Sequence, residues 1–200
     1  MGLAILIFGL VLFLGAHVFV SLRAQRARFI ERFGDSAYKW AISLVSAAGI
    51  IVIGWGFAQY RATGWVDIWY PPPWTRHVTV ALVWPSIIFI VAAFLQGRIK
   101  RALKHPMIVG VKLWAVAHLI SNGDLGSIIL FGSILGWAVN DRISFKYRTD
   151  SGASPLAGVL PAGMSDATKD ILAVVLGTLI YVALGFWFHP AVVGVKVFGS

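Results

Sequence analysis

The chain has 200 residues, of which 58% are hydrophobic and only 12% are charged, and its formal net charge is +9. A water-soluble domain averages about 25% charged residues, so this composition excludes an ordinary soluble protein and indicates a chain that crosses a membrane several times. The sequence has no cysteine, which excludes disulfides, iron–sulfur clusters held by thiolates and covalent c-type haem attachment.

The first apolar run is LAILIFGLVLFLGAHVFVSL, residues 3–22. A cleavable signal peptide carries positive charge before its apolar core, whereas here the charge follows the core. We therefore expect a retained anchor helix whose N-terminus lies outside. The arginines that follow the run are Arg23, Arg26, Arg28 and Arg32.

Two more apolar runs predict helices over residues 38–59 and 77–96. The segment between them has few charges and several Trp and Tyr residues, a composition typical of a membrane interface. Three consecutive prolines, Pro71 to Pro73, forbid a helix in this segment and favour an extended backbone.

A basic segment, GRIKRALKH, separates the third helix from a fourth over residues 106–120. Pro106 suits the first turn of that helix, where a missing N–H costs nothing. A tight SNGD turn leads into a fifth helix over 125–140, which has Gly132 and Gly136 at the GxxxG spacing of closely packed helices.

The last part of the chain begins with a polar loop over residues 149–168, which is rich in Gly, Pro and Ser. It ends with a sixth helix over about 170–189. If there are six spans, the basic segments at 23–39, 97–104 and 142–148 fall on one side. The positive-inside rule then places them in the cytoplasm and both termini outside. We therefore predict an all-α, polytopic bundle of about six transmembrane helices in one domain. These scattered basic segments account for the net charge, so we expect no nucleic-acid partner.

Two of the five histidines, His17 and His118, lie well inside apolar runs, whereas His77 and His189 lie at predicted helix ends. An ionisable residue inside a membrane is expensive and is a functional candidate by default. The alternative is a neutral imidazole that is hydrogen-bonded to a neighbouring helix, and the sequence leaves both interpretations open.

The fourth predicted helix has polar residues on two faces. At about 100° per residue, His105 and His118 point to nearly opposite sides, Lys112 shares the side of His105, and Trp114 shares that of His118. Two neutral imidazoles from different helices could hold a haem iron, whereas zinc would need a third or fourth ligand. Lys112 and Arg23 could pair with haem propionates or simply extend toward the membrane surface.

Four motifs together resemble the NnrU family of bacterial membrane proteins: LFLGAHVFVSLR, PPPWTRH, GRIKRALKHPMIVGVKLWAVAHLISNGD and GWAVNDRISFKYR. The resemblance covers residues 3–148, and the last quarter matches only in its general pattern. That family is named for an association with nitric-oxide and denitrification metabolism. It is similar to the plant and cyanobacterial 15-cis-zeta-carotene isomerases, which bind haem b through two histidines and isomerise a polyene double bond.

The resemblance implies haem b with His17 and His118 as its iron ligands. His105 is then the histidine of the His-Pro motif, although it stays an alternative to His118. One departure is Lys104, which stands where the isomerases have an arginine. The residues that the resemblance and the pattern place around the cofactor are Arg23, Lys112 and Trp114, and those of a surrounding or alternative site are His105, Asn122, Asp124, Asp141 and Arg142.

Three functions follow as hypotheses, and none assigns a catalytic residue. The first is a haem-b protein of the bacterial inner membrane, surrounded by lipid, that isomerises a hydrophobic polyene in a redox-dependent way or serves nitric-oxide metabolism, with an electron donor that the sequence does not identify. The second is a lipid methyltransferase- or reductase-like protein whose cytoplasmic site contains Lys104, His105 and Lys112. The third is a non-catalytic membrane scaffold.

Overall fold

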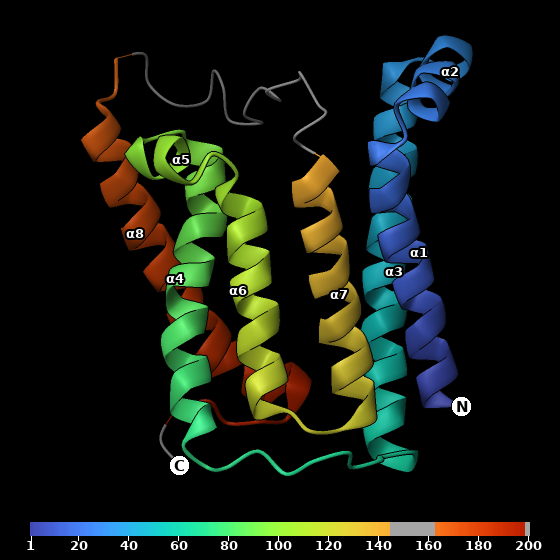
Figure 1. Ribbon diagram of the computed structural model, residues 1–200, viewed down its shortest axis with the longest axis vertical. Helices are drawn as coiled ribbons and strands as arrows, with labels where there is room; N and C mark the ends of the chain where they lie inside the picture. The colour runs from blue at the N-terminus through green and yellow to red at the C-terminus, as the bar shows by residue number, and fades with distance from the viewer. Residues whose placement is uncertain (145–162, 199–200) are drawn as a thin grey trace. The chain divides into compact units, whose positions relative to one another are not determined.

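The computed structural model describes residues 1–144 and 163–198, and these residues form helices and no strand (Figure 1). The predicted all-α class is therefore confirmed. The chain divides into two compact units, one containing Met1–Tyr70 and Asn122–Ser144 and the other Pro71–Ser121 and the C-terminal part. Most of the basic segment at 142–148 and of the polar loop at 149–168 lies outside the described residues.

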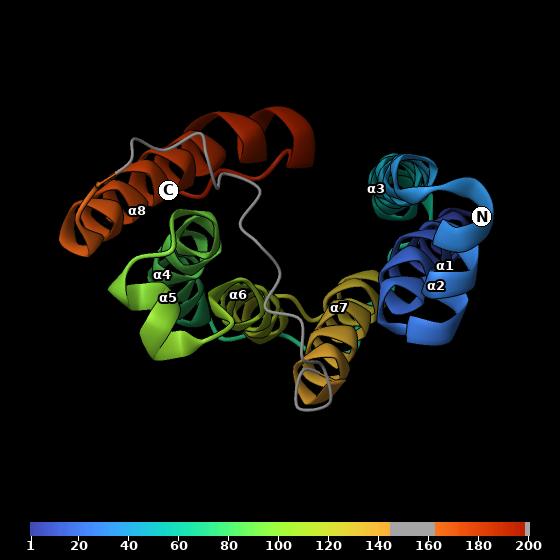
Figure 2. The same cartoon turned by 90° about the horizontal axis from the view of Figure 1, so that it is seen from above.

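The first unit consists of α1 (Gly2–Ser21), α2 (Arg23–Phe33), α3 (Asp35–Thr63) and α7 (Leu125–Ser144). The backbones of α1 and α3 approach closely along their length, and α1 also packs against α7 (Figure 2).

Four glycines make the approach of α1 and α3 feasible: Gly2, Gly9, Gly49 and Gly56. A Cβ atom at Gly9 would lie 2.6 Å from the backbone nitrogen of Ile53, and one at Gly49 would lie 2.8 Å from that of Phe13. Small residues permit such contacts. The close packing expected at Gly132 and Gly136 is not seen, because a Cβ at either meets no atom of the described residues within 4 Å.

The SNGD turn holds the end of the first unit together. Gly123 accepts backbone hydrogen bonds from Ile68 and Trp69 at 2.8 and 3.1 Å, and Leu125 donates to Val66 at 2.9 Å. Beside them, the buried Tyr60 hydroxyl accepts from the Val66 N–H at 3.1 Å. These contacts fix the start of α7 against the end of α3.

The second unit consists of α4 (Thr75–Leu95), α5 (Arg98–Leu103), α6 (Pro106–Ser121) and α8 (Asp166–Ala183), which continues as a π-helix, η2 (Leu184–Val193). Within this unit α4 packs against both α6 and α8 (Figure 2). The Ser86 hydroxyl donates to the Gly110 carbonyl of α6 at 2.8 Å, and the Tyr181 hydroxyl of α8 donates to the Val80 carbonyl at 3.0 Å.

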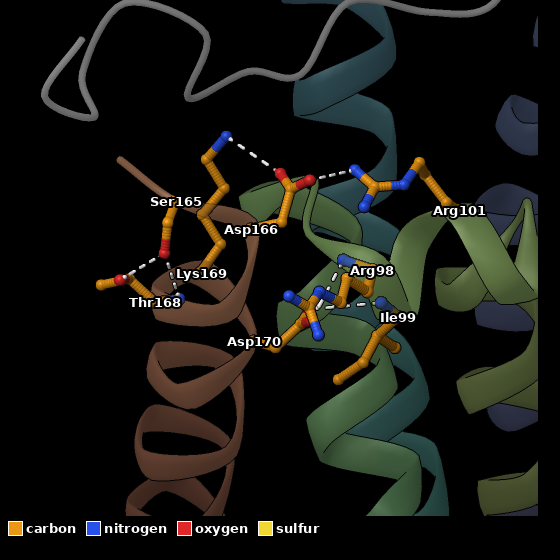
Figure 3. A network of polar contacts seen from close by, with 8 residues as sticks. All are labelled: Arg98, Ile99, Arg101, Ser165, Asp166, Thr168, Lys169 and Asp170. Carbon is orange, nitrogen blue, oxygen red and sulfur yellow. Dashed lines mark hydrogen bonds and ion pairs between the residues drawn. The ribbon is translucent and has the colours of Figure 1, made fainter. Parts of the chain in front are cut away.

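A polar network joins α5 to the start of α8 (Figure 3). The Asp170 carboxylate accepts the backbone N–H groups of Arg98 and Ile99 at 3.1 and 3.2 Å, so it satisfies two of the donors that a helix start leaves open. Asp166 accepts a hydrogen bond from the Arg101 guanidinium. The short basic helix is thereby tied to acidic side chains of its own unit.

All six predicted helices are present, and in the described ranges four helices are long and apolar enough to cross a membrane: α1, α3, α4 and the continuous α8–η2. At 16 residues α6 is apolar but shorter, as its predicted length indicated. A multi-pass membrane protein is supported. The expected basic loops at 23–39 and 97–104 prove to contain two further helices, α2 and α5. Arginine, alanine and glutamine are good helix formers, so charge alone did not mark these segments as loops.

Candidate functional site

His17 lies in α1, and its ring has a fixed orientation. Its Nδ1 is 2.7 Å from the carbonyl oxygen of Phe13, one turn earlier in the helix. A carbonyl can only accept a hydrogen bond, so Nδ1 carries the proton and Nε2 carries the lone pair of the neutral ring. The Phe13 ring supports the imidazole, with ring centroids 4.3 Å apart.

His118 lies in α6 and repeats this arrangement. Its Nδ1 is 2.9 Å from the Trp114 carbonyl oxygen, again one turn earlier, and the two rings have centroids 5.0 Å apart. The contact agrees with the shared face that the spacing of these two residues predicted. The same tautomer follows, with the lone pair on Nε2.

This geometry matches what metal-ligating histidines require. Such residues usually donate one ring N–H to a carbonyl or carboxylate, which sets the tautomer and makes the other nitrogen a better ligand. In both helices an aromatic residue four positions earlier provides the carbonyl and packs on the ring. In the neutral form of both rings, the nitrogen with the lone pair is therefore Nε2.

The two rings differ in their third neighbour. Trp137 of α7 meets His17 edge to face, with centroids 5.1 Å apart. His189 of η2 lies beside His118, with centroids 6.3 Å apart and planes only 26° apart. Within the described residues, Trp137 Nε1 and His189 Nδ1 are both buried without a hydrogen-bond partner. Each candidate ligand therefore has a buried and unsatisfied nitrogen in the side chain next to it.

Sequence reasoning missed Trp137 and His189. His189 was expected at a membrane interface, because its distance along the chain from His118 carries no contact information. An aromatic residue inside an apolar run, as at Trp137, is ordinary in a membrane helix. For His189 the Pro190 that follows it was the available signal, since a proline inside a helix displaces the neighbouring turns.

Asp141, of the predicted Asp-Arg pair, is a buried carboxylate that links α7 to α1. It accepts from the Ser21 hydroxyl at 3.1 Å and from the Ser144 hydroxyl at 3.2 Å. Ser21 lies one turn after His17, and Asp141 lies one turn after Trp137. The hydrogen bond and the His17–Trp137 contact therefore join the same two helices, one turn apart. Asp141 thus fixes the position of α1 close to His17.

The His-Pro motif begins α6 through a strained turn. Lys104 has φ +61°, in the region that disfavours residues with a side chain, and the His105 N–H donates to the Leu103 carbonyl at 2.6 Å across it. Lys112 follows in α6 and is half-buried. The structure thus places Lys104, His105 and Lys112 in the same unit as His118.

The remaining predicted residues lie in the first unit. Asp124 is buried at the start of α7, where one carboxylate oxygen accepts the Ser127 N–H at 2.9 Å, so it caps that helix. Asn122 begins the turn before it, Arg23 begins α2, and Arg142 lies in the last turn of α7. In the part of the chain that the structure describes, no group of three or more His, Asp or Glu side chains is arranged to hold a metal ion.

A comparison with protein families matches the model described as NnrU protein to residues 5–197. This match includes the last helix, which the sequence motifs did not cover. No curated protein and no solved structure matches the chain.

Proposed function

The chain belongs to the NnrU family, and on that premise we propose that it is an integral membrane protein that binds haem b through His17 and His118. The observation that supports this most is the shared orientation of the two rings, whose Nδ1 atoms lie 2.7 and 2.9 Å from backbone carbonyls. A carbonyl that accepts the Nδ1 proton sets the tautomer in which Nε2 is the ligand nitrogen.

The residues fit haem b better than they fit other metal groups. Without cysteine the haem would be held non-covalently, which is the b-type arrangement, and haem needs only two protein ligands. Zinc would need at least three. The buried nitrogens of Trp137 and His189 beside the two rings are positions that a bound group would satisfy: the Trp137 N–H donates, and His189 Nδ1 donates or accepts according to its tautomer.

The activity we propose is redox-dependent cis–trans isomerisation of a hydrophobic polyene, for which the bound haem supplies an iron whose Lewis acidity depends on its oxidation state. The chain's own residues would orient the ligand rings and exclude water. The Phe13 and Trp114 carbonyls hold the ligand rings, and the Ser21–Asp141 hydrogen bond holds α1. Arg23 and Lys112 would neutralise haem propionates, and the apolar helices would exclude water and bind the polyene.

The same cofactor would also serve the nitric-oxide or denitrification role for which the family is named. Ferrous haem is a receptor for nitric oxide, and an apolar site admits that small uncharged molecule. The two roles differ in their substrate. An added cis-polyene that is isomerised by the reduced protein favours the enzyme, and a nitric-oxide-dependent absorption change without polyene turnover favours the accessory role.

In this proposal the chain crosses the bacterial inner membrane six times, with both termini outside. The shorter α6 and the partly polar α7 would be the two spans beyond the four that length and composition support. Arginines of α2 and the basic residues of α5 would then lie in the cytoplasm, in keeping with the positive-inside rule. A cysteine inserted after Met1 and one that replaces Lys100 should react with an impermeant thiol reagent from opposite sides.

The His-Pro segment carries the second candidate function. Strained backbone persists where the surroundings enforce it, and such positions often belong to binding sites. The turn at Lys104 beside His105 therefore favours a nucleotide-cofactor site of the methyltransferase or reductase type. Saturable binding of S-adenosylmethionine or NADPH by haem-free protein, lost in His105→Ala and kept in His17→Ala, would support it.

The experiment that tests the haem proposal compares haem content among histidine variants. Wild-type protein purified from haem-replete cells should contain close to one haem b per chain. His17→Ala and His118→Ala should each lower that content at least about tenfold, because each removes one of the two side chains that would hold the iron. His77→Ala is the matched control and should keep it. Colourless wild-type protein would refute the haem proposal and leave the nucleotide-cofactor site and the scaffold as the remaining functions.

A further inference from the structure

Helix α2 is held at a membrane boundary by its neighbours in the chain. It has 11 residues, and single-residue breaks at Leu22 and Gly34 separate it from the apolar helices α1 and α3. Gly34 has φ +87°, a conformation that glycine adopts readily. Because α1 and α3 are both candidate spans, a short helix between them has to lie at the level of the lipid headgroups.

One face of α2 is apolar and anchored to the first unit. Phe29 and Phe33 lie one turn apart, with ring centroids 4.8 Å from each other. Phe29 also contacts Phe19 of α1 and Tyr38 of α3, each at 6.2 Å between centroids. Phe33 and Leu22 have 54% and 42% of their surface exposed. The apolar face therefore extends beyond the packed Phe29 to the exposed side chains of Phe33 and Leu22, and burying these two side chains requires apolar surroundings.

A second face of α2 is basic and next to the apolar one. At about 100° per residue, Arg28 and Arg32 lie one turn apart, roughly a quarter of a turn around the helix from Phe29 and Phe33. Side chains at that angle extend sideways along a surface in which the apolar face is embedded. This is the pattern of helices that lie in the membrane interface, with cationic groups at the level of the phosphates.

Helix α2 carries an excess of positive charge. Four arginines and a single glutamate give it a formal charge of +3. Among the described residues, Arg28 and Arg32 form no ion pair with an acidic side chain. In α5, by contrast, Arg101 is paired with Asp166 (Figure 3). Arg28 and Arg32 are therefore available to an anion from outside the described residues.

We propose that α2 is a binding site for anionic phospholipids, with Arg28 and Arg32 on the phosphate groups and Phe33 and Leu22 among the acyl chains. A lipid suits this surface better than a soluble anion because the basic and apolar residues are contiguous. A basic residue near an anionic leaflet strengthens binding about fivefold, and the attraction weakens as salt screens it. The site does not depend on the haem proposal.

The test is lipid binding by the full-length protein in detergent, measured by native mass spectrometry with phosphatidylglycerol and phosphatidylcholine. Wild-type protein should prefer phosphatidylglycerol by at least about fivefold, the effect expected of one arginine near an anionic surface. Arg28→Gln/Arg32→Gln should reduce that preference to near one. Arg61→Gln/Lys196→Gln is the matched control, because it removes the same charge from the last turn of α3 and from the segment after η2, and it should keep the preference.

Two outcomes would overturn the proposal: equal binding of both lipids by the wild type, or the same loss in the control as in the α2 variant. Inorganic phosphate that displaces phosphatidylglycerol at millimolar concentration would show a soluble-anion site instead. If the α2 variant does not fold, the wild-type preference is measured between about 0.05 and 0.5 M salt. It should fall with salt, and a constant preference would contradict the proposal.

Discussion

The surroundings of His17 and His118 share one design and differ in one neighbour. In each, an aromatic residue one turn earlier accepts the Nδ1 proton through its carbonyl and packs on the ring. His17 then meets Trp137, which cannot bind a metal, whereas His118 meets His189, which has a second imidazole. The orientation of each imidazole is thus set within its own helix. The aromatic neighbour that surrounds it comes from another helix of the same unit, α7 for His17 and η2 for His118.

The largest expected effect is that of a substitution in the packing of α1 against α3, which supports His17 and not His118. A side chain at Gly49 would press on Phe13, the residue whose carbonyl holds His17. Gly49→Val should therefore lower the free energy of unfolding by about 1–3 kcal/mol and reduce haem content, as seen by thermal unfolding and by absorbance.

Gly54→Val in the same helix is the control, because a Cβ there meets nothing within 4 Å of the described residues. It should leave both measurements near the wild-type values. Equal damage by the two variants would mean that the contact of α1 with α3 does not determine the position of His17.

A smaller effect is expected at the hydrogen bond that positions α1. Ser21→Ala removes the bond to Asp141 and leaves a buried carboxylate with one donor fewer, which should cost about 1 kcal/mol in the free energy of unfolding. Ser144→Ala should cost less, since Ser144 is in the same helix as Asp141 and ties no second helix. Chemical denaturation of the two variants should give that order. The reverse order would show that the hydrogen bond between Ser21 and Asp141 does not hold α1 in place beside α7.

The smallest effect concerns the two unsatisfied nitrogens. Trp137→Phe keeps an aromatic edge on His17 but removes the N–H, and His189→Phe does the same for Nδ1 beside His118. In haem-free protein each variant should be neutral or up to about 1 kcal/mol more stable, because an unpaired buried polar group is itself costly. A clear loss of stability in either would show that the nitrogen already has a partner.

Much of the fold could be predicted because a helix that crosses a lipid bilayer has to be apolar and about 20 residues long. Apolar runs of adequate length gave the six helices near their observed bounds, and a spacing of four residues placed Trp114 on the face of His118. The two basic helices were missed because charge marks a membrane boundary without specifying loop or helix. Gly132 and Gly136 had the right spacing, but close packing occurs at Gly9 and Gly49.

The candidate site was predictable only in its local part. The apolar surroundings of His17 and His118 were plain from the sequence, and the family motifs singled out the same residues. The contacts with Trp137 and His189, and the bond from Ser21 to Asp141 across 120 positions, depend on how distant helices pack. No periodicity within one helix contains that information.

The central claim is that two histidines with fixed rings bind haem b. It is tested most directly by the absorption spectrum of purified wild-type protein in its oxidised and dithionite-reduced states, recorded beside His17→Ala and His118→Ala. The wild type should show the Soret and α bands of a b-type haem, and both variants should lose them. An iron-free wild-type protein without a Soret band, or full bands in both variants, would contradict it.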